Sequence, residues 1–233
     1  MNRCSVVTVS CLVVLAALFV APPVQSADVL AGIPVVGDFG TDLHAARDNV
    51  DLVQGSTVAK TRLTRGGLTI SESYGEHLAL GMFGGYAAAT QKGQDVTAGL
   101  DFKGGYAGVN LQAMAPLGRW VSTGITAQVL YQWLKDSTPT QEVKLEWWQG
   151  DALLDVEIHP TRFLTLYGGP TYTSISVDQT ARGTVDATTN FDGRRKSGAV
   201  YGLRLEVDLH GWVTLEAREG PLKGVALSFQ RRY

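Results

Sequence analysis

The sequence predicts an all-β chain that closes into an antiparallel transmembrane β-barrel of about eight to ten strands, with short turns at one end and longer loops at the other. Three observations lead to this fold class. Apolar and polar residues alternate with period two through most of the chain after residue 56, the connections between the alternating segments differ in length, and aromatic residues gather near the segment ends. The alternation by itself fits a soluble barrel equally well, because the two kinds of barrel differ only in which face meets water.

Residues 1–26 are typical of a secretory signal. Arg3 precedes an apolar run that ends at Pro22-Pro23, and a cleavage site is expected after Ser26. The alternative, an uncleaved membrane anchor, is disfavoured because the run is short. Both cysteines, Cys4 and Cys11, lie in this segment, so we expect no disulfide, thiol nucleophile or cysteine metal site in the remaining chain. Removal of Arg3 leaves 19 of the 20 basic residues against 22 acidic ones, which does not indicate a nucleic-acid partner.

Residues 27–55 differ from the rest of the chain because they lack clear period-two alternation. Leu43, Ala46 and Val50 recur at helical spacing within residues 42–53. We therefore expect a periplasmic N-terminal segment with a short helix at the barrel mouth. A leader without fixed structure is the alternative. The barrel itself is predicted to span residues 56–233.

Alternation is clearest in residues 199–233. The odd-numbered positions from Tyr201 to Leu209 are apolar, while Arg204, Glu206 and Asp208 occupy even-numbered positions between them. Further strands or hairpins are predicted at residues 57–74, turning at Arg65-Gly66-Gly67, and at 78–90, 96–115, 120–134, 143–158 and 163–177.

Double glycines interrupt three of these segments, at Gly84-Gly85, Gly104-Gly105 and Gly168-Gly169. The apolar phase changes across the second and third pairs, which predicts β-bulges that curve the sheet. The alternative is a hairpin turn at Gly104-Gly105, which would change the strand count.

The connections favour the transmembrane form of the barrel. Tight turns are expected at residues 75–77, 116–118, 159–161 and 210–211, whereas the connection at 136–140 is longer and that at 178–197 is the longest. Short periplasmic turns and long extracellular loops describe an outer-membrane barrel, in which aromatic residues flank the apolar band. The aromatic residues expected in these girdles are Trp120, Trp133, Trp147, Trp148, Phe163, Tyr167 and Trp212.

Two segments carry a resemblance to a known family. Residues 224–233 resemble the C-terminal assembly signal of bacterial outer-membrane barrels, with alternating Val225, Leu227 and Phe229 before the aromatic Tyr233, although Arg231 departs from the pattern. Residues 156–169 resemble the strand, tight turn and strand of small barrels of the OmpA, OmpX and OmpW type. The resemblance covers residues 56–233 and implies location in the bacterial outer membrane and contact with its barrel-assembly machinery. It does not imply an activity, because such barrels include tethers, pores, adhesins and enzymes.

Charged residues near the end of the chain predict pairs inside the barrel. Arg204, Glu206, Glu216 and Arg218 fall on one face of a predicted hairpin, where Arg204 can neutralise Glu216 and Arg218 can neutralise Glu206. Structural pairing is favoured over acid–base chemistry, because unpaired buried charge is costly.

No catalytic, cofactor-binding or metal-binding residues are predicted, and we do not expect an enzyme. The four histidines are His44 in the N-terminal segment and His77, His159 and His210 beside turns, all expected on the periplasmic side. Asp186, Asn190 and Asp192 in the long loop are too unspecific a set to indicate a metal site.

Arg194, Arg195 and Lys196 end the longest loop, where the chain is expected to re-enter the membrane. Three adjacent cations there can meet lipopolysaccharide phosphates, and an ordinary solvated loop is the alternative. Three functions stay open. The chain is an outer-membrane barrel with a structural or interaction role, a narrow porin-like channel for small solutes, or a soluble periplasmic barrel that binds an apolar ligand.

Overall fold

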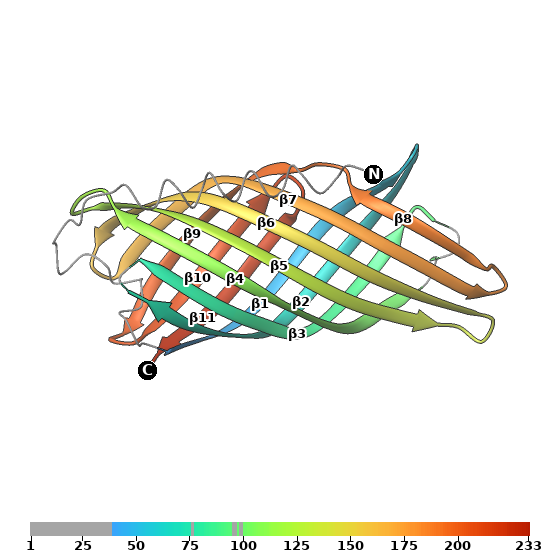
Figure 1. The fold of residues 1–233 in the computed structure, drawn as a ribbon, viewed down its shortest axis with the longest axis horizontal. Helices are drawn as coiled ribbons and strands as arrows, with labels where there is room; N and C mark the ends of the chain where they lie inside the picture. The colour runs from blue at the N-terminus through green and yellow to red at the C-terminus, as the bar shows by residue number, and fades with distance from the viewer. Residues whose placement is uncertain (1–38, 76, 95–96, 98–99) are drawn as a thin grey trace.

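The computed structural model of the protein describes residues 39–75, 77–94, 97 and 100–233, so the predicted signal with both cysteines lies outside the described residues. The described chain is all-β, as expected, and its strands run antiparallel to their neighbours (Figure 1). The strands are β1 (Phe39–Gln54), β2 (Thr57–Tyr74), β3 (Leu78–Lys92), β4 (Asp101–Pro116), β5 (Val121–Ser137), β6 (Gln141–Thr161), β7 (Leu164–Gly183), β8 (Ala187–Gly193), β9 (Ser197–Asp208), β10 (Gly211–Glu219) and β11 (Lys223–Arg232).

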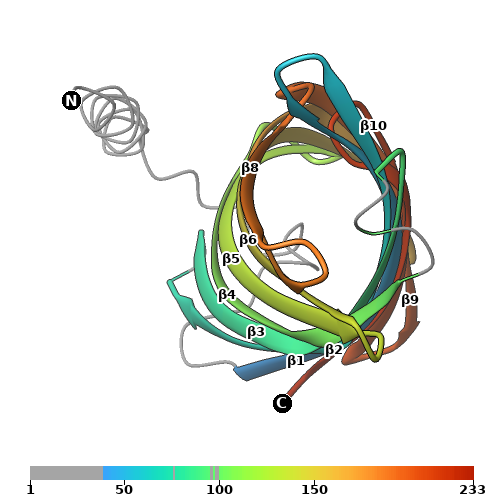
Figure 2. The ribbon, with the colours of Figure 1, turned by 90° about the vertical axis from the view of Figure 1, so that its right-hand side faces the viewer.

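The sheet closes on itself because β11 pairs with β1 (Figure 2). The two ends of the barrel have different strand numbers. At the end that contains Phe39 and Tyr233, β7 pairs with β9 over residues 164–172, and the ring contains β1–β7 and β9–β11. At the other end β7 pairs with β8 over residues 176–181, and β8 pairs with β1 at Leu52 and Val53. The short β8 thus takes the place of three strands, and the ring there contains β1–β8.

The alternation in β2 shows why these residues form a barrel with two unlike halves. Odd-numbered side chains point inward along the whole strand, and even-numbered side chains point outward. Before Gly66-Gly67 the inward residues include Leu63 and the outward residues include Arg62. After the glycines the order reverses, because Thr69 and Ser71 point inward and Leu68 points outward. Side chains of β2 therefore alternate regularly between inward and outward along the whole strand. The inward face, however, changes from apolar to polar halfway along it.

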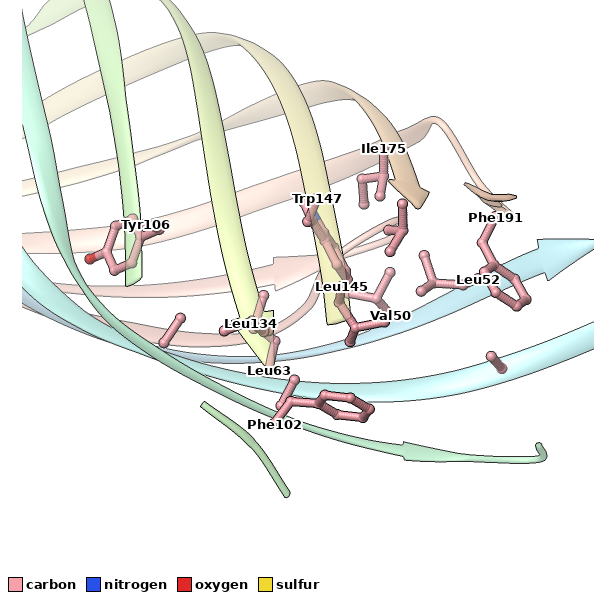
Figure 3. Packing of buried hydrophobic residues seen from close by; sticks show 14 of the residues in the cluster. Val50, Leu52, Leu63, Phe102, Tyr106, Leu134, Leu145, Trp147, Ile175 and Phe191 are labelled. Carbon is pink, nitrogen blue, oxygen red and sulfur yellow. The ribbon is translucent and has the colours of Figure 1, made fainter. Parts of the chain in front are cut away.

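We name the two halves by what fills them. The apolar-core half contains β8 and the parts of β1–β7 beside it, and its interior is packed with hydrophobic side chains (Figure 3). The largest of its fully buried side chains are Trp147, Phe102, Phe191, Leu52, Leu63, Leu130 and Leu145. The polar-lumen half contains β9–β11 and the remainder of β1–β7. Its interior is polar and its outer wall is apolar.

The predicted helix in residues 42–53 is wrong, because this stretch belongs to β1 and pairs with β2 on one side and β11 on the other. The barrel therefore begins before residue 56. The alternation was hidden because the inward face of β1 changes from Asp42 and Asp48 to Val50 and Leu52 along the strand. Helical spacing of Leu43, Ala46 and Val50 was coincidental, since Leu43 points outward and the other two point inward.

The double glycines are neither bulges nor turns. The register of β4 with β3 and β5 is continuous through Gly104-Gly105, and β2 runs straight through Gly66-Gly67 as one strand. The apparent phase change is the polarity inversion itself. Gly105 also makes room for an aromatic ring on the outer wall, because a Cβ there would lie 2.5 Å from the indole of Trp133.

Candidate functional site

The polar-lumen half encloses a cavity of about 280 Å³. Strands β6, β7, β9 and β10 supply most of its charged groups because each places alternate residues inward. Charged and ionisable residues among its lining are Asp42, Asp151, Asp155, Glu157, Tyr167, Arg204, Glu216, Arg218 and Glu219. A second hollow of about 210 Å³ adjoins the apolar-core half, where Tyr106 and Leu130 form part of its wall.

Two connected groups of contacts organise the larger cavity. Tyr167 donates a hydrogen bond of 2.8 Å to Glu216, and the Arg218 guanidinium binds the same carboxylate. Arg204 Nη1 lies 3.4 Å from Glu157 Oε1, and its guanidinium carbon lies 5.7 Å from the centre of the Tyr167 ring. Tyr167 therefore lies between the two arginines and contributes to both groups.

The structure places Arg204, Glu216 and Arg218 in the lumen, but with other partners than those predicted. Arg204 pairs with Glu157 of β6, and Arg218 pairs with Glu216 on its own strand. The register explains this, since Thr214 stands opposite Arg204 and Gly202 stands opposite Glu216. Glu206 lies opposite the buried Trp212 and forms no ion pair within 4.0 Å among the described residues.

Two histidines lie in the lumen rather than beside solvent. His44 Nε2 is 2.6 Å from the Tyr106 hydroxyl, near the middle of the barrel. His159 lies near the other end of the lumen, with Nε2 3.0 Å from Ser122 Oγ and Nδ1 3.0 Å from Thr165 Oγ1. The inward position of His159 could have been predicted from the sequence, because His159 follows Asp155 and Glu157 at alternate positions of one strand.

Ser122, His159 and Glu157 do not have the geometry of a catalytic triad. A triad carboxylate binds the Nδ1 atom of the histidine, whereas here Nδ1 faces Thr165 and Glu157 lies 3.9 Å from Nε2. Ser122 is also only 2% exposed, so a substrate carbonyl could not reach its Oγ. Within the described residues, no cluster of three or more His, Cys, Asp or Glu side chains is arranged to hold a metal ion.

The aromatic residues expected in the girdles divide between the outer and inner faces of the barrel. Trp120, Trp133, Trp148 and Phe163 are exposed on the outside of the barrel. Trp147 and Trp212 are buried inside it, and Tyr167 lines the cavity. Trp147 and Trp148 are neighbours in sequence and point to opposite faces, so only one of them could have belonged to a girdle.

The remaining predicted residues lie on the outer surface. Val225, Leu227, Phe229 and Tyr233 are exposed apolar side chains at alternate positions, except for the wider step before Tyr233. Arg194, Arg195 and Lys196 link β8 to β9 and are exposed. The Arg194 backbone N–H donates to the Asp51 carbonyl across 2.9 Å, and its guanidinium lies 3.7 Å from the Asp51 carboxylate, which ties this link to β1.

No helix among the described residues is long and apolar enough to cross a bilayer. No protein-family model matches the chain, and no curated protein matches it. Among solved structures, the outer-membrane protein OprG from Pseudomonas aeruginosa superposes with a TM-score of 0.51 and 16% identity, over 88% of this chain and 99% of that one. The translocator domain of the autotransporter NalP from Neisseria meningitidis gives 0.49 and 11%, over 87% and 90%. The chain thus has the closed antiparallel fold of an outer-membrane β-barrel, as the sequence predicted.

Proposed function

We propose that this chain is an integral protein of the bacterial outer membrane whose barrel does not conduct solutes and serves a structural or interaction role. The observation that carries this proposal is the apolar-core half. Its lumen is filled by fully buried side chains such as Leu63, Leu145 and Trp147. A packed hydrophobic interior leaves no path for water or ions, in contrast to the water-filled lumen of a porin.

The outer wall of the polar-lumen half supports membrane insertion. Outward residues there are apolar and exposed, for example Leu154, Val156 and Ile158 of β6. The apolar stretch of this strand runs from Trp148 to Ile158, which matches the length of about 9–11 residues that a tilted strand needs to cross a bilayer. A soluble protein would have to leave this whole band in water, so the soluble-barrel alternative is disfavoured.

Exposed aromatic residues border the band. Trp148 and Tyr131 pack with ring centroids 4.8 Å apart where the wall changes from apolar to charged. At the other border Arg119 lies over Trp120 and Arg162 lies over Phe163, at 5.2 and 4.2 Å from the ring centres. This arrangement suits the two membrane–water interfaces.

The orientation is assigned from the difference between the two ends of the barrel. At the end with Phe39 and Tyr233, the connections between strands have two to four residues. The other end carries β8, and of the connections there only the one at residues 93–100, between β3 and β4, is longer than four residues. We assign the short turns to the periplasm and the apolar-core half to the cell exterior. In this orientation Arg194, Arg195 and Lys196 meet the lipopolysaccharide layer. Val225, Leu227, Phe229 and Tyr233 face lipid and form the signal for the barrel-assembly machinery.

Conductance measurements test the proposal. The full chain, reconstituted in planar bilayers after its heat-dependent gel shift has shown folding, should give no unitary conductance. A variant with Leu63→Ala, Leu145→Ala and Trp147→Ala removes much of the apolar filling and should conduct. The matched control Trp148→Ala, which changes the outward neighbour, should stay silent. Regular conductance steps from the native chain would contradict the proposal and favour the narrow channel.

A further inference from the structure

The outer wall carries a predominantly basic patch on β11, β1, β2 and β3, just beyond the apolar band. Its exposed basic side chains are Arg47, Lys60, Arg62, Lys92 and Lys223. Strand register brings them together, because Asn49 of β1 has Arg62 on one side and Lys223 on the other. Lys60 stands directly opposite Lys92. Like charges in directly opposite positions destabilise a sheet unless an anion lies between them.

The described residues do not supply that anion. None of the five basic side chains has a described carboxylate within 4.0 Å. Asp51 stands opposite Lys60, but its carboxylate is engaged by Arg194 at 3.7 Å. Arg195 extends the patch, since it lines a surface hollow together with Lys223 and Glu219.

The opposite wall has a different charge pattern. Lys103, Lys135 and Lys144 also stand opposite one another on β4, β5 and β6. Only Lys144 of these three has a carboxylate partner, Glu142 at 3.0 Å. This hydrogen bond and the charge of Lys144 lower the pKa of Glu142. The opposite wall therefore contains one lysine neutralised by a carboxylate within 4.0 Å, whereas none of the five basic side chains of the patch has such a partner among the described residues.

An apolar groove of about 610 Å³ lies on the same strands as the basic patch. It forms because the small residues Ala45 and Gly84 lie between large outward ones. The outward side chains that line it include Leu43, Leu68, Val213, Leu227 and Phe229. Arg47 lies two residues along β1 from Ala45, so its Cα stands about 7 Å beyond the groove residue in the direction of the patch.

A groove in the lipid-facing wall with cations at its outer end matches one kind of molecule, an amphiphile with an anionic headgroup and acyl chains. We propose that β11, β1, β2 and β3 form a binding site for the lipid A part of lipopolysaccharide. Arg47, Arg62 and Lys223 bind its sugar phosphates, and an acyl chain lies along Ala45 and Gly84. Arginine guanidinium groups match the geometry of phosphate oxygens, and the bound phosphate relieves the repulsion within the patch. The inference rests on the outer-membrane orientation given under Proposed function, which assigns the patch to the outer leaflet.

The charge arm of the test uses the full chain purified in detergent and incubated with purified lipopolysaccharide. A variant with Arg47→Gln, Arg62→Gln and Lys223→Gln should bind it at least about ten-fold more weakly, since several charge-assisted hydrogen bonds are lost. The matched control, with Lys103→Gln, Lys135→Gln and Lys144→Gln, makes the same change in net charge on the opposite wall and should bind as the native chain does. Equal losses in the two variants, or no loss in the first, would overturn the site.

The groove arm tests the acyl-chain contact separately. Ala45→Phe fills the groove and should weaken lipopolysaccharide binding at least about five-fold through loss of apolar contact. Ala127→Phe makes the same substitution at an exposed position of β5 and should have no effect. Unchanged binding by Ala45→Phe would overturn the assignment of the acyl chain.

A third arm distinguishes the source of the anion. The triple variant Arg47→Gln, Arg62→Gln and Lys223→Gln should also lose affinity for vesicles containing phosphatidylglycerol, but by less than half of its loss for lipopolysaccharide. An equal loss for the two lipids would overturn the assignment to lipid A, because the patch would then recognise anionic lipids in general. The heat-dependent gel shift of every variant reports barrel folding, and fractionation of cells reports location. A failure of outer-membrane placement is thus distinguishable from a failure of the lipid site.

Discussion

Arg65 of β2 donates a 2.8 Å hydrogen bond to Asp48 of β1, and both side chains are buried at the level where the lumen changes from polar to apolar. Asp48 is 1% exposed and Arg65 is 6% exposed. Removal of only one partner of such a buried ion pair is costly, because the charge that remains is not solvated by water. The pair fixes the register of β1 on β2 at the boundary between the two halves of the barrel.

Arg65→Met should therefore destabilise the barrel by about 3–5 kcal/mol, the usual cost of leaving a buried charge unpaired. The double variant Asp48→Leu with Arg65→Met should be destabilised by much less than the sum of the two single variants. Urea unfolding in detergent micelles measures both values. Lys135→Met, an exposed change on the outer wall, should stay within about 0.5 kcal/mol of the native chain. Additive losses would contradict a coupled pair.

The lumen contacts give a second prediction about coupling. Arg204 and Glu157 should show an interaction free energy in a double-mutant cycle, because they are 3.4 Å apart in a partly buried site. Arg218 and Glu206 should show less than about 0.5 kcal/mol, since Arg218 is engaged by Glu216. The substitutions Arg204→Met, Glu157→Gln, Arg218→Met and Glu206→Gln keep side-chain volume similar. The opposite ranking would indicate that the pairs expected from the sequence are the ones that form.

The assignment of outward and inward side chains in β11 can be tested at two adjacent residues, Phe229 and Ser228. Phe229→Asp puts a charge on the outer wall, at a cost of up to a few kcal/mol in the bilayer, and should block assembly into the outer membrane. Deletion of Tyr233 should also lower assembly, if the resemblance to the family signal holds. Ser228→Asp changes the neighbour that lines the lumen and should be tolerated better. Quantification of the heat-modifiable form in membrane fractions checks this, and normal levels of the Phe229→Asp protein would put its predicted role in error.

The sequence was sufficient for the barrel because period-two alternation is visible in most of the long strands after β1. It did not predict the two halves, because alternation reports that faces differ but not which face is inside. Arg62 and Leu68 both point outward in β2, although one is charged and the other apolar. In β1 the same inversion removed the alternation from the sequence and left a false helical spacing. From the sequence alone, the inversion of polarity at Gly66-Gly67 therefore predicts a turn, and the one at Gly104-Gly105 predicts a bulge.

The site was predictable in part for a related reason. The alternation of side chains along β9 and β10 predicts that Arg204, Glu216 and Arg218 share a face, because the two strands are consecutive in the sequence. It could not identify Glu157 as the partner of Arg204, because β6 meets β9 only across β7 and the lumen. The buried pair of Arg65 and Asp48 was missed because each residue looks like part of an ordinary charged face when its strand is considered alone.

The proposed orientation can be tested with single cysteines, because the sequence contains none beyond Cys4 and Cys11 in the predicted signal. Arg195→Cys introduces a thiol into the link between β8 and β9, and Arg162→Cys introduces one between β6 and β7. Both positions are exposed, so accessibility depends on the compartment rather than on burial. A membrane-impermeant maleimide should label Arg195→Cys on intact cells and Arg162→Cys only after the outer membrane is permeabilised. The native chain gives the background. The reverse pattern would invert the topology and would move the basic patch to the periplasmic leaflet, where lipopolysaccharide is absent.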